Sequence, residues 1–239
     1  NNSNDETLKS IKDTGKKCLM ISNKINFGYG KAINIGMTKV KTKFCLIVNP
    51  DLLFEKNFFK KLLNGVKHNP EFGLMAPRLS SVFSKSKTNK PDISTKFISG
   101  ACFLIDVSIL KNRVFDENIF LFYEDNILSD KMIKLGHKLI LLGKCYVYHE
   151  GENSTEKNFS IDKLRNWHMG WSEAYYILKG NKNLNIFILA NIIVKIRRAL
   201  VFLIFFRIKR FNAVFYRLKG IVCYLKGIDC HSRRDVGPF

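Results

Sequence analysis

The sequence predicts an α/β domain followed by a basic, amphipathic α-helical region. Over residues 1–157, short apolar runs of strand length alternate with segments whose apolar residues recur at helical spacing. This alternation is typical of an α/β sheet with covering helices. From residue 158 onward the strand-like runs cease, and long helical segments rich in Lys and Arg follow. We therefore expect two regions, residues 1–157 and residues 158–239.

The formal net charge of +20 in 239 residues lies unevenly along the chain. Residues 1–160 carry 25 basic and 16 acidic side chains, whereas residues 161–239 carry 15 basic and only 4 acidic ones. No acidic residue lies between Ala174 and Ile228. A basic stretch of this length indicates an anionic surface as the partner of the C-terminal region.

The six cysteines contain no C-x-x-C pair, and four of them lie within or beside apolar runs. Zinc sites and small disulfide frameworks both show characteristic cysteine spacings, which this chain lacks. We therefore expect buried free thiols in a reducing compartment.

A glycine-rich turn joins a short predicted strand, residues 18–22, to a helix predicted over residues 31–43. The turn contains Asn26, Gly28 and Gly30. Backbone N–H groups at a helix N-terminus favour anions, so the turn resembles one that holds a phosphate. The third glycine of a dinucleotide-binding fingerprint is missing, and a tight turn into a packed helix explains the glycines equally well.

An apolar run, Phe44–Val48, ends in Asn49, Pro50 and a lone carboxylate, Asp51. Its β-forming residues predict a buried strand whose end presents Asp51 at the edge of the sheet. Ligands collect at the carboxyl ends of parallel strands, where a carboxylate can hold a hard cation against phosphate oxygens. An Asp at such a position is also an ordinary turn residue, and on this triplet alone that interpretation is simpler.

The middle of the chain adds a helix over residues 54–66 and strands over residues 72–76 and 97–105. Gly100 in the last strand permits a close approach of backbone. Residues 77–96, rich in Ser, Lys and Asn, form a loop long enough to act as a lid, although disorder is equally compatible with it.

Two adjacent acids, Glu124 and Asp125, follow an aromatic run and begin a helix predicted over residues 126–135. Acids in a first helical turn often only complement the helix dipole. The aromatic run would instead place the pair against apolar walls, where a raised pKa suits a general base. Strands over residues 138–142 and 145–148 follow and end at His149, a residue type that is more often a hydrogen-bonded polar group than a ligand.

Taken in order, these stretches resemble the glycosyltransferase family 2 enzymes, especially the rhamnosyltransferase-like branch that acts on bacterial surface polysaccharides. The resemblance runs from about residue 1 to 155 and implies a nucleotide-sugar-binding GT-A fold. The matching phrases are Asn26-x-Gly28-x-Gly30-x-x-x-Asn34-x-Gly36, Asn49-Pro-Asp51, Ser99-Gly-Ala101, Phe115-Asp-Glu117, Phe120 to Asp125, and His149-x-Gly151-x-x-Ser154.

The resemblance also implies a role for each matching residue. Asp51 would hold Mg²⁺ or Mn²⁺ on the donor diphosphate, and His149 would face the metal and the phosphates. Asp125, or Glu124 beside it, would deprotonate the acceptor hydroxyl, which gives a single displacement with inversion. The residues implied in donor binding are Asn26, Gly28, Gly30, Asn34, Asn49 and Gly100.

The resemblance begins just after the second strand of the family. We therefore expect an incomplete GT-A sheet that lacks the first strand, the first helix and most of the second strand, with exposed sheet edges as a result. An inactive, truncated remnant is accordingly an alternative to an active enzyme.

The C-terminal region is expected to attach peripherally to a membrane. Residues 184–206 include 18 apolar residues among 23, enough to span a bilayer, but Lys195, Arg197 and Arg198 in the middle offset the gain. As a helix, this segment places Asn191, Lys195 and Arg198 on one face, where they could contact anionic headgroups. A packed helical subdomain with a solvated basic face is the alternative.

These observations together predict an inverting glycosyltransferase at the cytoplasmic face of the bacterial inner membrane. Its donor would be a nucleotide-diphospho-sugar, with rhamnose suggested by the branch, and its acceptor a lipid-linked glycan of O-antigen or capsule synthesis. Charge alone suggests a nucleic-acid-binding protein as a further alternative. No nucleic-acid partner is expected, because the basic residues lie among long aliphatic runs and no recognisable binding motif is present.

Overall fold

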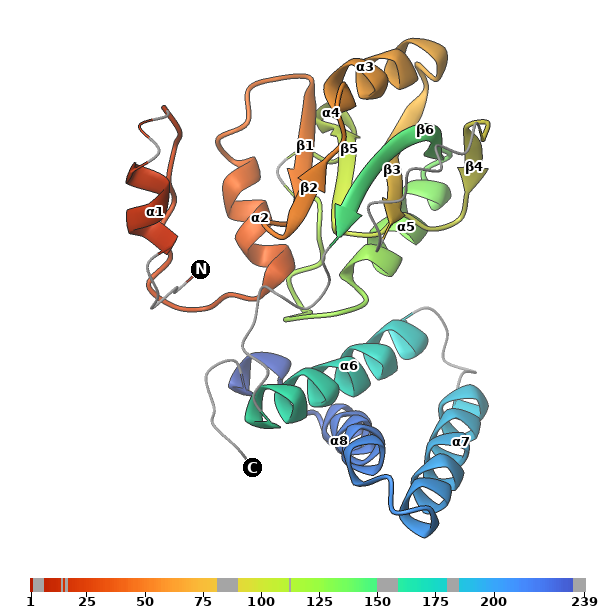
Figure 1. Ribbon diagram of the computed structural model, residues 1–239. Coiled ribbons are helices and arrows are strands. Elements are labelled where there is room, and N and C mark those ends of the chain that lie inside the picture. The colour runs from red at the N-terminus through yellow and green to blue at the C-terminus, as the bar shows by residue number, and fades with distance from the viewer. Residues whose placement is uncertain are drawn as a thin grey trace. The chain divides into compact units, whose positions relative to one another are not determined.

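The structure is a computed structural model of residues 1–239, and it describes the whole chain except residues 2–6, 14, 16, 81–89, 112, 150–158, 180–184 and 234–239. The described residues form two compact units (Figure 1). Unit 1 comprises residues 1–39, 117–122 and 162–239, and unit 2 comprises residues 40–116 and 123–161. The chain therefore passes between the units several times. The predicted boundary at residue 157 would divide the chain only once, and it stays a prediction.

Unit 2 contains a mixed six-stranded sheet in the order β1-β5-β3-β6-β2, with β4 paired to β6 (Figure 1). Among the described strand pairs, β3 and β6 run parallel, and the others are antiparallel. The strands are β1 (Phe44–Val48), β2 (Leu52–Phe54), β3 (Phe72–Ser80), β4 (Ile93–Thr95), β5 (Cys102–Asp106) and β6 (Lys138–His149).

Helix α5 carries charges at both ends that suit the helix dipole. In α5, Glu124 and Asp125 occupy the first turn and Lys131 and Lys134 the last, and Gly136 follows with a φ of 82°. The helices are α1 (Thr7–Asp13), α2 (Tyr29–Met37), α3 (Phe58–His68), α4 (Val107–Leu110), α5 (Glu124–Lys134), α6 (Phe159–Lys179), α7 (Asn185–Ile204), α8 (Ile208–Leu225) and a 3-10 helix, η2 (Cys230–Arg233).

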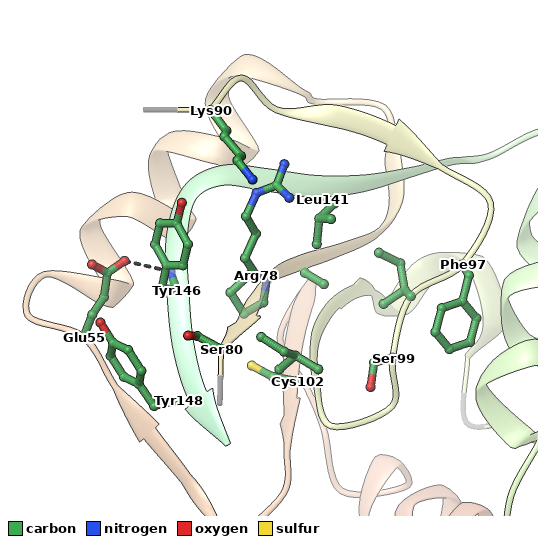
Figure 2. Close-up of a pocket in the computed structure, with 14 residues that line it drawn as sticks. Glu55, Arg78, Ser80, Lys90, Phe97, Ser99, Cys102, Leu141, Tyr146 and Tyr148 are labelled. Atoms are coloured by element: carbon green, nitrogen blue, oxygen red, sulfur yellow. Dashed lines mark hydrogen bonds between the residues drawn. The ribbon is translucent and has the colours of Figure 1, made fainter. Parts of the chain in front are cut away.

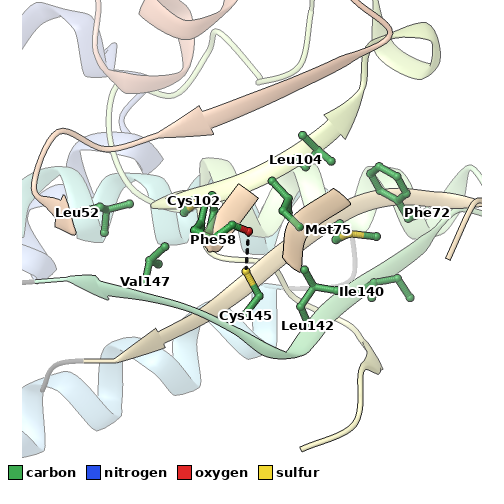
Figure 3. Packing of buried hydrophobic residues seen from close by; sticks show 11 residues of the cluster. Leu52, Phe58, Phe72, Met75, Cys102, Leu104, Ile140, Leu142, Cys145 and Val147 are labelled. Carbon is green, nitrogen blue, oxygen red and sulfur yellow. Dashed lines mark hydrogen bonds between the residues drawn. The ribbon is translucent and has the colours of Figure 1, made fainter. Parts of the chain in front are cut away.

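The core of unit 2 lies against the central strand β3. Residues 72–77 of this strand are buried without alternation, which is the pattern of a strand covered on both faces. Figure 3 shows Phe58 of α3 facing the strands, with the Cys145 thiol close to its carbonyl oxygen. The prediction of free thiols is confirmed, since all six cysteines are unpaired and four of them are buried.

Two predicted strands differ from the structure. β1 is an edge strand that pairs antiparallel with β5, so the expectation of a buried strand is wrong; Val48 at its end is exposed. Residues 18–22 form no strand, and Leu19 there is 72% exposed. A strand needs a hydrogen-bonded neighbour, and local apolar character does not supply one.

Other elements have different bounds from those predicted. The segments 138–142 and 145–148 are one continuous strand, β6, and the fifth strand begins at Cys102 rather than at residue 97. The predicted loop over residues 77–96 is wrong at both ends, because its beginning belongs to β3 and residues 93–95 form β4, which pairs with β6. Residues 81–89 lie outside the described part of the chain.

In unit 1, α6 packs closely against α8 through two glycines. A Cβ at Gly170 would meet the carbonyl oxygen of Arg217, and one at Gly220 would meet the carbonyl oxygen of Trp167. Trp171 donates from its indole N–H to the Ile228 carbonyl at 2.7 Å. Helix α6 is therefore largely a packing element, because both of its tryptophans, Trp167 and Trp171, are buried.

The surface of α7 and of its turn into α8 is strongly apolar. Phe205 is 69% and Phe206 86% exposed, and exposed Ile, Leu and Val side chains continue along α7. Arg197, Arg198 and Arg207 belong to the same segment. Among the helices that the structure describes, none combines the length with the apolar character needed to cross a bilayer.

Lys195 of α7 does not belong to this exposed surface. Its Nζ forms an ion pair with the Glu173 carboxylate of α6 at 2.9 Å, and both side chains are less than 15% exposed. Asn191 donates to the same carboxylate at 2.8 Å. The expectation that Lys195 and Asn191 contact lipid headgroups is therefore wrong for these two residues, because both satisfy a buried acid.

Candidate active site

Asp51 lies in the short turn that joins β1 to β2. The turn is fixed at its start, where the Asn49 N–H donates to the Ala101 carbonyl at 2.8 Å. At its end, Leu52 stands opposite His149 in the antiparallel pairing of β2 with β6. Asp51, which is partly buried, thus directly precedes Leu52, the strand partner of His149. The register thus places the turn that carries Asp51 next to the end of β6, where His149 lies.

The strand arrangement around Asp51 differs from the expected one. A set of parallel strands was expected to converge there, but β1 runs antiparallel to its neighbour β5. The parallel pair consists of β3 and β6, and His149 is the last residue of β6. The side chain of His149, together with Gly151 and Ser154 of the same phrase, lies outside the described part of the structure.

A short loop before β5 connects this turn to the predicted base. The Gly100 N–H donates to Asp125 Oδ2 at 3.2 Å, and the next residue, Ala101, accepts the hydrogen bond from Asn49. The Asn126 N–H donates to Asp125 Oδ1 at 3.0 Å. Three sequence motifs that are distant along the chain are therefore joined through two consecutive residues of one loop.

The two adjacent acids at the start of α5 differ in their environments. Glu124 is 8% exposed, and burial, followed by the nearby Asp125 charge, raises the pKa of its carboxyl group to about 8. Its Oε2 is buried and has no hydrogen-bond partner among the described residues. Burial also raises the pKa of Asp125, but the N–H donors of Gly100 and Asn126 oppose this effect. At neutral pH Glu124 is therefore mostly protonated, whereas hydrogen bonds stabilise the Asp125 carboxylate.

Sequence reasoning missed an unusual backbone just before these acids. Phe122 and Tyr123 both adopt left-handed conformations, with φ of 69° and 64°. Such conformations cost non-glycine residues about 1–3 kcal/mol each and are frequent at functional sites. No residue in the aromatic run signals this conformation, because Gly or Asn would be the usual occupant.

In unit 1, the glycine-rich turn has a structural explanation. Gly28 has a φ of 83°, and a Cβ there would meet the Phe120 carbonyl oxygen. That oxygen accepts a hydrogen bond from the Tyr29 N–H at 3.0 Å, while the Gly28 N–H donates to Asn26 Oδ1 at 3.0 Å. Gly28 is therefore required for the close approach of segment 117–122 to the start of α2, and its role in donor binding stays a prediction.

Two further predicted motifs meet within the same unit. Asn34 is 3% exposed and donates from Nδ2 to Glu117 Oε1 at 3.1 Å. Lys31 lies 3.7 Å from the other oxygen of the same carboxylate. Asn34 and Glu117 thus bind each other, and the role of Asn34 in donor binding stays a prediction. Gly30 is buried within the first turn of α2.

The predicted site residues therefore form two groups. The first group lies in unit 1 and consists of Asn26, Gly28, Gly30 and Asn34. The second group lies in unit 2 and consists of Asn49, Asp51, Gly100, Glu124, Asp125 and His149. Within the second group, described hydrogen bonds to the loop Gly100-Ala101 link Asn49 and Asp125.

A cavity of about 510 Å³ lies beside the second group, and no motif in the sequence indicates it. Figure 2 shows Arg78, Lys90, Tyr146 and Tyr148 around it, together with Ser99 of the loop that holds Asp125. Arg78 and the tyrosines lie on β3 and β6, whose register only the structure reveals. Aromatic and polar side chains around a cavity of this size are typical of a small-molecule site.

Comparison with known proteins adds a family match and several similar folds. Residues 1–114 match the model of Glycosyl transferase family 2. The fold is similar to that of S. aureus TarS in complex with UDP-GlcNAc, with a TM-score of 0.51 and 16% identity over 95% of this chain and 81% of that one. It is also similar to the mannosyltransferase PcManGT from Pyrobaculum calidifontis in complex with GDP-Man and Mn²⁺, with a TM-score of 0.55 and 12% identity over 94% and 75% of the two chains.

A crystal structure of GalNAc-T7 with UDP, GalNAc and Mn²⁺ is similar over a smaller share of its length. The TM-score is 0.52 with 16% identity, and the match covers 74% of this chain but only 42% of that one. No curated protein sequence matched the chain. The chain is thus a mixed α/β protein whose fold is similar to that of the GT-A glycosyltransferases, and its first 114 residues match the glycosyl transferase family 2 model.

Proposed function

We propose that this chain is an inverting glycosyltransferase that transfers a sugar from a nucleotide-diphospho-sugar. The observation that carries the proposal is the loop Gly100-Ala101, which binds the Asp125 carboxylate on one side and the turn leading to Asp51 on the other. A base for the acceptor and a ligand for the donor metal are required at one site by this chemistry. The family match and the nucleotide-sugar complexes of similar fold support the same reaction class.

Asp125 is the base in this proposal. Its carboxylate is partly exposed, whereas that of Glu124 is buried, so Asp125 can reach an acceptor hydroxyl. The two N–H donors on its oxygens orient the carboxylate and leave lone pairs for the incoming proton. Removal of that proton as the hydroxyl attacks the anomeric carbon makes the acceptor oxygen a better nucleophile, and attack opposite the leaving group inverts the configuration.

Asp51 and His149 are the proposed metal ligands. The carboxylate of Asp51 is partly buried and directly precedes Leu52, the strand partner of His149. It offers the oxygen ligand that divalent cations such as Mg²⁺ or Mn²⁺ prefer, and His149 is retained as the second candidate ligand from the sequence motif. The bound cation would neutralise the developing charge on the departing nucleoside diphosphate. Asn26, Gly28, Gly30, Asn34, Asn49 and Gly100 are retained as candidates for donor binding.

We further propose that the acceptor is a lipid-linked glycan of surface-polysaccharide synthesis and that the protein attaches peripherally to the cytoplasmic face of the inner membrane. The exposed Phe205 and Phe206 and the arginines of α7 support this, because apolar side chains next to basic ones bind anionic lipid surfaces. Rhamnose as the donated sugar and O-antigen or capsule as the product are proposals from the resemblance of the sequence motifs alone.

The proposal is tested by measuring release of nucleoside diphosphate from a panel of UDP-, GDP- and dTDP-sugars in the presence of lipid-linked acceptors. Asp51→Asn should abolish the release that depends on the acceptor, and chelation of divalent metal should do the same. Asp162→Asn is the matched control, since it removes an equal charge from an exposed position on α6. Unchanged release in Asp51→Asn would remove this residue from the reaction.

A further inference from the structure

The cavity beside β3 and β6 contains two cationic side chains that no described acid neutralises. Arg78 lies on β3, and its Nε is buried without a hydrogen-bond partner among the described residues. Lys90 also lines the cavity and points towards Arg78 in Figure 2. No ion pair links either residue to an acid within the described part of the chain.

The acid of the cavity, Glu55, is already engaged elsewhere. One of its oxygens lies 2.6 Å from Lys61 Nζ, and the other accepts the Tyr146 N–H at 2.7 Å. The Glu55 carboxylate is therefore neutralised by Lys61 and satisfied by the backbone. The cavity as a whole keeps an excess of positive charge that comes from Arg78 and Lys90.

An anion would remove two unfavourable features at once. Neighbouring cations repel each other, and a buried N–H donor without a partner loses the hydrogen bond that it would make with water. A phosphate or carboxylate between Arg78 and Lys90 would accept from both, and the planar guanidinium is suited to paired hydrogen bonds with such oxygens.

The remaining lining suits a sugar next to that anion. Tyr146, Tyr148, Phe97 and Ser99 supply aromatic faces and hydroxyl groups, and the volume of about 510 Å³ lies in the usual range for small-molecule sites. The Tyr146 hydroxyl is itself held by the Gly143 carbonyl at 3.1 Å, which fixes the ring position. The cavity can therefore hold a pyranose-sized group as well as an anion.

The cavity adjoins the proposed catalytic residues. Ser99 lines it and directly precedes Gly100, whose N–H binds Asp125, and Tyr148 lines it and directly precedes His149. We propose that this cavity binds an anionic group of the acceptor, a phosphate or a carboxylate, through Arg78 and Lys90. The acceptor would then be an acidic glycan or a phosphate-bearing one. The identity of the ligand as acceptor rests on the proposed function, whereas anion binding itself does not.

Anion binding is tested by NMR on the full chain, through the Arg78 Nε–H resonance. Its assignment comes from the signal that Arg78→Gln removes. Titration with inorganic phosphate or with glucuronate should shift this resonance saturably, whereas titration with neutral glucose alone should leave it nearly unchanged. A response to phosphate alone indicates a phosphate-bearing acceptor, and a preference for glucuronate indicates an acidic sugar. The absence of a saturable response to either anion would overturn the proposal.

Variants distinguish anion binding in the cavity from general attraction of anions to the basic surface. Lys90→Gln should weaken anion binding about tenfold, because a hydrogen bond to a charged group is lost. Arg113→Gln, which removes an exposed charge, should leave the affinity unchanged. Arg78→Lys keeps the charge without the planar fork and should bind with intermediate affinity. Equal affinity in Lys90→Gln and the wild type would contradict the assigned site, provided that both unfold at the same temperature.

The inference and the proposed function can fail separately. If the wild-type chain releases no nucleoside diphosphate from any donor of the panel, the proposed function is wrong, while the response of Arg78 to phosphate is unaffected by that result. If transfer depends on both acids, Lys90→Gln should raise KM for the acceptor about tenfold and leave KM for the donor unchanged. An equal rise of both KM values would contradict acceptor binding in this cavity.

Discussion

The Gly100 N–H donates a hydrogen bond to Asp125 Oδ2 at 3.2 Å. These residues are separated by 25 positions in the sequence, and the bond connects the start of α5 to the loop before β5. The same loop accepts the Asn49 N–H through Ala101. Asp125 is thus held by the segment that also holds the turn carrying Asp51, and the proposed reaction depends on this arrangement.

The activity should depend on pH through Asp125. A general base acts in its ionised form, and burial raises the Asp125 pKa above that of an ordinary aspartate. The value of kcat/KM should therefore rise with pH along a limb that lies above about pH 4, the usual aspartate value. A pH-rate profile checks this, and an acidic limb at or below the ordinary aspartate pKa would contradict it.

Glu124 should make the stability of the fold depend on pH. Its folded pKa of about 8 exceeds the unfolded value, so its contribution to stability is complete below about pH 4.5 and is lost as the pH rises towards 8. Glu124→Gln should remove a pH dependence on the order of a few kcal/mol across this window. Urea unfolding of the two proteins between pH 5 and about pH 9 measures the difference. Identical slopes of stability against pH would show that Glu124 is not buried as described.

Gly28→Ala should destabilise unit 1. The added Cβ would meet the Phe120 carbonyl oxygen, and the φ of 83° is unfavourable for alanine. We expect a loss of about 1–3 kcal/mol in the free energy of unfolding. Gly36→Ala is the matched control, because a Cβ there meets open space within the same helix and should stabilise it by about 0.5–1 kcal/mol. Thermal unfolding that shows the same sign for both variants would contradict the close contact.

The buried pair of Lys195 and Glu173 gives a further prediction. Lys195→Met leaves the Glu173 carboxylate buried without its cation and should cost about 3 kcal/mol or more. The double variant Lys195→Met with Glu173→Leu should recover most of this loss, because no charge then remains buried. Chemical denaturation of the two single variants and the double variant forms the test. Additive losses in the double variant would show that the two charges do not interact.

Membrane attachment is tested by vesicle sedimentation. Changing Phe205 and Phe206 to Ser should weaken binding to vesicles that contain phosphatidylglycerol, since two large exposed side chains would no longer enter the lipid. Leu19→Ser, at a position that is 72% exposed in the same unit, is the control and should bind as the wild type does. Binding of the double variant at wild-type strength, or binding to neutral vesicles that equals binding to anionic ones, would exclude the proposed surface.

Local sequence patterns predicted the helices better than the strand partners. The apolar periodicity of α3 and the acids at the start of α5 follow from interactions within a few residues, and both helices overlap their predicted ranges. Helix α3 begins at Phe58 and not at residue 54, which belongs to β2. The position of β1 at a sheet edge and the absence of a strand at residues 18–22 depend instead on hydrogen bonds to distant segments. No local pattern contains that information.

The candidate site was predictable in part for the same reason. Asp51 and Asp125 stand at ends of apolar runs, which marked them in the sequence. Arg78 and Lys90 resembled ordinary loop residues, because their charges gain significance only when β3 and β6 pair and leave a cavity beside them. The sequence pattern of α7 suggested that Lys195 contacts lipid, whereas in the structure it forms an ion pair with Glu173. Long-range packing thus decides the role of charged residues more than their spacing does.

The transfer rates of Asp125→Asn and Glu124→Gln, measured in the same assay, test the proposed reaction most directly. Loss of a general base should reduce kcat by about 10²–10⁴-fold in Asp125→Asn. Glu124→Gln should keep most of the activity, because the Glu124 carboxyl is already mostly protonated at neutral pH. A severe loss in Glu124→Gln combined with near-normal transfer by Asp125→Asn would contradict the assignment of the base.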